Sequence, residues 1–171
     1  MKQFDSRMEI SSVEAFNQNK KALETLLEDS SLSAKILPLA KEYKEIMEQL
    51  DPLIQKLSSE SCPSCGVVCC AQKFGIPNTT DLLIALALNI EDLHYDFAKD
   101  LNGMCQFMGK TGCILPRYKR PFRCTFYFCD PLLIQIDLLP PKEHRSLIDG
   151  LQKLEYLRYK MAILAGIKSP F

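Results

Sequence analysis

The stretch ILPLAKEYKEIMEQLDPLIQKL (residues 36–57) decides the fold that we predict from this sequence. Its apolar residues recur at alternating spacings of four and three, which places them on one face of an α-helix. Pro52 lies within the stretch and removes a backbone donor, so we expect a kink or a break there. The face is predicted to pack inside the domain, with a dimer through the N-terminal helices as the alternative. It comprises Ile36, Ala40, Tyr43, Met47, Leu50, Ile54 and Leu57.

Two further amphipathic helices are predicted, one near each end of the chain. One runs from Ser12 to about Glu28, with Ser11 or Ser12 as its cap, and the serines at positions 30, 31 and 33 are expected to end it. The last helix begins at Pro140-Pro141. Its predicted apolar side comprises Leu147, Ile148, Leu151, Leu154, Leu157, Met161 and Leu164.

The middle of the chain is predicted to hold shorter elements. Asn78, Thr79 and Thr80 offer a cap for a helix from Asp81 to about Leu88. Asn89 with Asp92 is expected to open another helix, which runs to Asp100. Two short strands at 104–108 and 113–115, joined by the turn sequence GKTG, predict a β-hairpin.

These elements predict a mainly α fold: a helical domain with a small β-hairpin and a cysteine-rich metal-binding core. We expect an N-terminal helical segment at 1–61, a cysteine-cluster core at 62–129 and a C-terminal helix at 130–171 that packs on the core. A chain of 171 residues buries enough surface to fold without cross-links. The cysteines therefore need another explanation.

Eight cysteines stand beside only two histidines, and all eight lie within residues 62–129. The N-terminus runs directly into polar sequence, and no apolar stretch is long enough for a membrane span, so we expect a cytoplasmic protein without membrane contact. Thiols stay reduced in the cytosol, where clustered cysteines are typical of metal binding. The candidate metal ligands are Cys62, Cys65, Cys69, Cys70, Cys105, Cys113, Cys124 and Cys129.

The first four cysteines form a C-x2-C-x3-C-C arrangement. If the segment is locally helical, Cys62, Cys65 and Cys69 share one face and Cys70 points elsewhere. A fourth ligand is then expected from the second group, because the loop between Pro116 and Pro121 folds its cysteines back. Which four thiols bind, and whether they form one centre or two, stays open at this point.

The spacing favours an iron–sulfur cluster, most simply [4Fe–4S], with zinc as the alternative. Two C-x2-C pairs would indicate zinc most strongly, and this chain has only one. Residues 101–129 carry five basic and no acidic side chains, which would offset the negative charge of a thiolate-bound cluster. The total of 21 basic and 21 acidic residues gives no net charge and argues against generic nucleic-acid binding.

Three motifs resemble a known family, the zinc- or iron-chelating cysteine-cluster proteins, which include the flagellin lysine methylases. They are CPSCGVVCC (62–70), the pair CQFM (105–108) and GCIL (112–115), and RPFRC (120–124). Family members carry arginine directly after the last of these cysteines, whereas Thr125 stands there in this chain and Arg123 precedes the cysteine. The resemblance implies a metal or iron–sulfur centre built from these cysteines.

For the methylase branch, the resemblance also implies lysine methylation with S-adenosylmethionine. If the protein is an enzyme, Arg117, Arg120 or Arg123 would hold the carboxylate of that cofactor. The substrate, a protein or a small molecule, is not specified. The alternatives are a zinc-stabilised module that binds nucleic acid or protein, and a metal storage or delivery protein.

Overall fold

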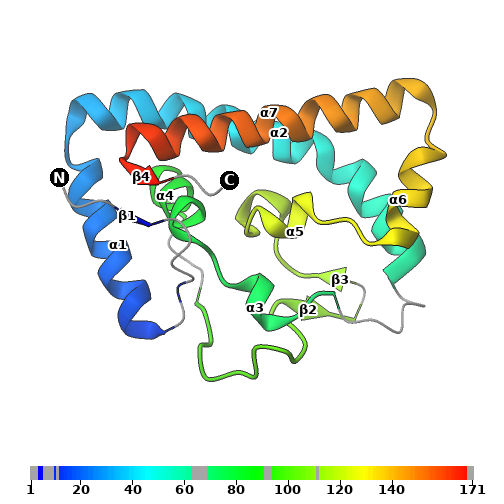
Figure 1. Ribbon diagram of the computed structural model, residues 1–171, viewed down its shortest axis with the longest axis horizontal. Helices are drawn as coiled ribbons and strands as arrows, with labels where there is room; N and C mark the ends of the chain where they lie inside the picture. The colour runs from blue at the N-terminus through cyan, green and yellow to red at the C-terminus, as the bar shows by residue number, and fades with distance from the viewer. Residues whose placement is uncertain are drawn as a thin grey trace.

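Two long helices form the frame of the protein (Figure 1). The computed structural model describes residues 4–5, 10, 12–62, 69–90, 94–110 and 112–168. α2 (Ser30–Ser61) and α7 (Pro141–Leu164) lie side by side and run in opposite directions. The described residues are mainly helical, as predicted. The other helices are α1 (Val13–Leu27), α3 (Gln72–Gly75), α4 (Thr79–Ala87), the 3-10 helix η2 (Arg117–Lys119), α5 (Arg123–Phe126) and α6 (Asp130–Asp137).

The predicted apolar face of α2 is confirmed. Every one of its seven residues, from Ile36 to Leu57, is buried. α7, α4, α6 and η2 all pack against α2 inside the same chain, so a dimer through this helix would have to use another face. Pro52 does not split the helix, because α2 continues through both Pro38 and Pro52. The ribbon of α2 changes direction in its second half (Figure 1), which fits the loss of one backbone hydrogen bond at Pro52.

The apolar face of α7 differs from the prediction in its last turns. Leu147, Leu151 and Leu154 are buried as expected, together with Leu157 and Met161. Leu164 is 37% exposed, so its assignment to the buried face was wrong. A charged residue, Arg158, is buried on this face instead. Arg158 can be buried because it forms an ion pair with Asp81, which is described with the candidate site.

Side-chain caps fix the ends of several helices. Ser12 Oγ accepts a hydrogen bond from the Ala15 amide at 3.1 Å and begins α1, as predicted. The break after α1 is confirmed, but Asp29 rather than the serines begins α2, because its carboxylate accepts hydrogen bonds from two backbone amides of the next turn. α4 begins after Asn78, in a capping box completed by Asp81.

The predicted helix from Asn89 to Asp100 is wrong for the part that the structure describes. Asn89 has a φ of 54° and lies just beyond the end of α4. The backbone amides of Asn89 and Ile90 donate hydrogen bonds to carbonyls of the last turn of α4, as at many helix C-termini. Asn89 therefore ends a helix instead of beginning one. Residues 94–100 are irregular, and residues 91–93 lie outside the described part.

Two small sheets complete the fold. β2 (Met108–Gly109) and β3 (Gly112–Cys113) are antiparallel, so the predicted hairpin is confirmed with shorter strands. Gly112 has a φ of 124°, which an L-residue with a side chain rarely adopts. β1 (Phe4–Asp5) pairs in parallel with β4 (Ile167–Lys168). No helix among the described residues is long and apolar enough to cross a membrane.

One hydrophobic cluster joins the two terminal segments of the chain. It contains Leu23 of α1, Met47 of α2, Leu83 of α4 and Leu154 of α7, among other buried residues. The helices of 12–61 and 130–168 therefore share a core. The shorter elements between them, with most of the cysteines, lie below this frame in Figure 1.

Gly150 marks the closest approach of α7 to α2 and gives a test of this packing. A methyl group at position 150 would lie 2.8 Å from Leu50 Cδ2. We expect Gly150→Ala to lower the free energy of unfolding in urea by about 1 kcal/mol, because overpacking typically costs about 1–3 kcal/mol and the better helix propensity of alanine returns up to about 1.

The sign should reverse when the obstructing side chain is removed. In a Leu50→Ala background, Gly150→Ala should raise the free energy of unfolding, because only the propensity effect remains. An equal loss of stability in both backgrounds would contradict the proposed contact.

Candidate metal centre

Six of the seven described cysteines line one cavity of about 230 Å³, which we call the cysteine cavity. Its walls come from the second half of α2, α3, the β2–β3 hairpin, η2 and α5. The thiols are reduced, with no disulfide among the seven described cysteines. The six that line the cavity are Cys62, Cys69, Cys70, Cys105, Cys113 and Cys124.

The other two of the eight cysteines, Cys129 and Cys65, are not among the described residues that line this cavity. Cys129 occupies the N-cap position of α6 without a capping hydrogen bond from its side chain. It is half-buried, packs against the hydrophobic core and does not line the cysteine cavity. Cys65 lies outside the described residues, in the gap 63–68. The expected shared helical face of Cys62, Cys65 and Cys69 falls largely on that gap, and Cys69 and Cys70 beyond it are not helical.

Backbone hydrogen bonds bring the two cysteine groups together. The Cys105 amide donates to the Cys70 carbonyl at 2.8 Å, and an antiparallel bridge joins the neighbouring residues Ala71 and Met104. The two segments are thus held side by side although 34 residues separate them along the chain. The hairpin register then places Cys113 opposite Met108, three residues beyond Cys105.

A buried glutamine fixes this junction. Gln72 is 1% exposed, and its side-chain oxygen accepts a hydrogen bond from the Gln106 amide at 2.8 Å. Its side-chain nitrogen donates to the Asp96 carbonyl at 2.8 Å and to Gln106 Oε1 at 2.9 Å. Gln106 in turn donates to the His94 carbonyl. These bonds, together with one from the Asp96 amide to Gln106 Oε1, satisfy backbone groups of His94 and Asp96 without a helix, which fits the failed helix prediction there.

Gly75 closes one wall of the cavity. A Cβ atom at this position would lie 2.5 Å from Cys105 Sγ, so α3 approaches the thiol more closely than any side chain permits. The position of the Cys105 thiol therefore depends on the absence of a side chain at position 75.

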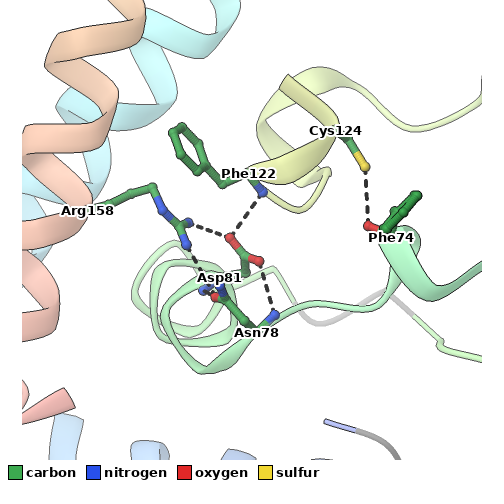
Figure 2. Close-up of polar contacts among 6 residues, drawn as sticks. All are labelled: Phe74, Asn78, Asp81, Phe122, Cys124 and Arg158. Atoms are coloured by element: carbon green, nitrogen blue, oxygen red, sulfur yellow. Dashed lines mark hydrogen bonds and ion pairs between the residues drawn. The ribbon is translucent and has the colours of Figure 1, made fainter. Parts of the chain in front are cut away.

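Cys124 is positioned by a network of polar contacts (Figure 2). Its thiol donates to the Phe74 carbonyl, with a separation of 3.5 Å. Two residues earlier, the Phe122 amide donates to Asp81 Oδ1 at 3.1 Å. The second oxygen of Asp81 accepts from the Asn78 amide at 3.1 Å. The carboxylate of α4 thus anchors the turn that carries Cys124.

The counter-ion of Asp81 is Arg158 of α7. One guanidinium nitrogen donates to Asp81 Oδ1, and a second donates to Asn78 Oδ1 at 3.3 Å. Tyr43 of α2 hydrogen-bonds the same guanidinium, which also lies 4.5 Å from the centroid of the Phe122 ring. Burial works against the charge of Arg158, but Asp81 and Tyr43 outweigh it and raise its pKa.

The sequence contains a signal for this arginine that the prediction did not use. Positions 147, 151, 154, 158 and 161 repeat the four-three spacing seen in α2. Arg158 therefore occupies a core position, where a charged residue requires a buried partner. Its partner Asp81 was predicted only as part of a helix start.

Three arginines and a lysine line the cysteine cavity. Arg117 is 2% exposed, and its Nε lies 2.7 Å from Asp51 Oδ1. Burial lowers the pKa of Arg117, and the positive charge of Arg120 adds to this effect. Arg120 Nε donates to the Leu115 carbonyl at 2.8 Å, and Arg123 stacks over the Phe74 ring at 4.1 Å. The fourth cation is Lys110.

The described lining of this cavity contains no carboxylate and no imidazole. Thr125, which stands where the resembling family carries arginine, is fully buried and does not line the cavity. Arg123 lines it instead, from the other side of Cys124. The structure thus brings all three arginines predicted to bind a cofactor to the cysteine cavity.

The thiols raise one another's pKa because they face the same space. Burial raises the pKa of Cys70 to about 12, and the nearby Cys69 and Cys62 add to the rise. Burial likewise raises the pKa of Cys124 to about 12, with a contribution from Cys113. A metal that binds here must displace protons from these thiols.

The six thiols line one cavity without forming a compact group of ligands among the described residues. Within the described ranges, no three His, Cys, Asp or Glu side chains stand close enough together to hold one metal ion. Cys65 is not among the residues to which this finding applies. The donor set is therefore rich in thiols, without a tight single-ion geometry in its described part.

Comparison of the chain with protein-family models, with curated proteins and with solved structures finds no match.

The Asp81–Arg158 pair predicts a large effect on stability. In Asp81→Ala, the buried guanidinium loses its counter-ion, and we expect the free energy of unfolding to fall by about 3–5 kcal/mol in urea denaturation. The control is Glu42→Ala, which removes an ion pair of 3.0 Å between α2 and α7 whose side chains are 44–45% exposed. This control should cost at most about 1 kcal/mol. Similar effects of the two variants would contradict the assigned importance of the buried pair.

Proposed function

We propose that this protein binds an iron–sulfur cluster in the cysteine cavity. The observation that carries the proposal is the composition of the cavity lining: six thiols, four cations and neither a carboxylate nor an imidazole among the described residues. Thiolates favour zinc, copper(I) and iron–sulfur clusters, whereas magnesium, calcium and manganese require oxygen ligands. The donor set therefore supports a soft metal centre.

Two features favour a cluster over a single zinc ion. In a [4Fe–4S] cluster each thiolate binds a different iron, so its ligands are spread around the cluster and need not converge on one point. The six described thiols come from several segments of the chain and outnumber the four that one cluster needs, which suits that requirement. The cluster with its four thiolates is also anionic, and Arg117, Arg120, Arg123 and Lys110 supply compensating positive charge.

Zinc remains the second candidate, because four of these thiols would bind it after rearrangement. The cavity also holds more thiols than one centre needs, which supports metal storage or delivery as an accompanying role.

Methyl transfer from S-adenosylmethionine remains a prediction that rests on the resemblance to the cysteine-cluster family. When bound, this cofactor would supply an electrophilic methyl group. Arg117 is held by Asp51, so Arg120 and Arg123 are the better placed of the three predicted arginines to hold a carboxylate in the cavity.

Anaerobic purification tests the metal assignment. We expect a brown protein with about four iron and four sulfide per chain, because a [4Fe–4S] cluster has that composition. Absorption spectroscopy, iron analysis and sulfide analysis measure it. A colourless protein with stoichiometric zinc would refute the cluster. Cys105→Ser and Cys124→Ser should lose most of the iron, while Cys129→Ser should retain it because Cys129 lies outside the cavity.

Gly75 provides a test of the cavity that leaves every thiol in place. Gly75→Ala must push Cys105 Sγ away from its position, so we expect a lower iron content after reconstitution, measured by metal analysis. The control is Gly103→Ala, where the nearest atoms to an added Cβ belong to Asp100 and no thiol is displaced. Full iron content in Gly75→Ala would count against Cys105 as a ligand.

A further inference from the structure

A second cavity, of about 240 Å³, lies on the other side of the segment that carries Arg120. Its walls come from α1, α4, Tyr43 of α2 and the stretch from Tyr118 to Pro121, with His94 and Tyr95 at one side. We call it the aromatic cavity. No cysteine is among its described lining residues, so its chemistry differs from that of the cysteine cavity.

Aromatic rings form much of this wall. Phe16 of α1 and Tyr95 have ring centroids 5.5 Å apart, and Tyr95 meets Phe107 edge-on at 5.8 Å. Phe16 also packs against Phe97. Tyr118 also lines the cavity, and Lys44 Nζ lies 4.7 Å from the centroid of its ring. Rings fixed by neighbouring rings offer a preformed surface on which a planar group can stack.

The charges on the lining are unbalanced. Lys20, Lys119 and Arg120 contribute three cations, whereas Asp81 is the one carboxylate in the described lining. Lys20 forms an ion pair of 3.6 Å with Glu24 on the same helix, but both side chains are well exposed and such pairs are weak, so a bound anion competes for Lys20. Asp81 already has a buried counter-ion in Arg158, so its charge is compensated inside the protein. A ligand in this cavity therefore meets a net positive lining, which favours an anionic group.

Arg120 lines both cavities. Its Nε is fixed by the Leu115 carbonyl, which holds the side chain in the wall between them. A molecule in the aromatic cavity would thus lie within one side chain of the cysteine cavity.

We propose that the aromatic cavity binds a small molecule that combines a planar ring with a carboxylate or a phosphate. The ring stacks among Phe16, Tyr95 and Tyr118, and the anionic group contacts Lys20 or Arg120. This site is separate from the metal site, and the proposal stands whether or not the cysteine cavity holds a cluster.

Ligand-observed NMR titration with matched probes tests the proposal on the full-length protein. Indole-3-acetate and AMP carry a ring and an anion, whereas tryptamine and adenosine keep the ring without the negative charge, and acetate and phosphate lack the ring. We expect binding of at least one of the first pair, and at least about tenfold weaker binding of its partner in the second pair and of the free anion. Which of the two ring anions binds distinguishes a carboxylate ligand from a nucleotide phosphate.

Lys20→Gln places the site and has a matched control. Lys20 lines the aromatic cavity, whereas its neighbour Lys21 is exposed on the same helix and does not line it. Lys20→Gln should weaken probe binding about threefold to tenfold, and Lys21→Gln should leave it unchanged. Equal affinity for the charged and uncharged probes, no binding of either ring anion, or equal effects of the two variants would overturn the proposal.

Metal content is measured on the same samples, so the two proposals fail separately. Probe binding in a protein without iron would leave the aromatic site standing and refute the cluster. Iron in a protein that binds neither ring anion would do the reverse.

Discussion

The ion pair between Arg158 and Asp81 is the constraint on which the arrangement of the middle of the chain depends. It joins α7 to α4, and through Tyr43 it also engages α2, so three helices meet at one buried charge. Separating either partner would leave an uncompensated charge inside the protein. Because the same carboxylate accepts the Phe122 amide, the helical frame sets the position of α5 and, with it, of Cys124. The position of Cys124 in the candidate metal site therefore depends on the packing of the helical core.

The sequence predicted the frame well because its pattern is strong and local. The seven-residue face of α2 and the cap of α4 depend on periodicity and on side chains three residues apart, and both are confirmed. In the mispredicted segment 94–100, backbone groups of His94 and Asp96 are bonded by Gln72 and Gln106, which are distant or follow later in the sequence, instead of by a helix. Arg158 was not predicted to be buried because only apolar residues were assigned to that face, although its spacing places it in the core.

The candidate site was predictable in its residue types but only partly in its geometry. Six of the eight predicted ligands line one cavity, and the three arginines lie among them. Cys129 lies elsewhere because α6 begins there and turns it toward the core. The close approach of Gly75 to Cys105 had no sequence signal, since it arises from two segments, 70–75 and 101–106, that are joined by hydrogen bonds across a long stretch of chain. Such contacts depend on long-range packing, which a single sequence does not reveal.

A metal bound by both cysteine groups would also restrict the unfolded chain, because the two groups are far apart in the sequence. A centre that took ligands from both cysteine groups, for example Cys70 and Cys105, would close a loop of 36 residues, from position 70 through position 105. A cross-link over a loop of this length lowers the entropy of the unfolded chain by an amount equivalent to roughly 3–4 kcal/mol at room temperature. α2 and α7 lie outside that loop. A bound metal would therefore stabilise the short elements of the middle of the chain, whereas the two long helices depend on their own packing.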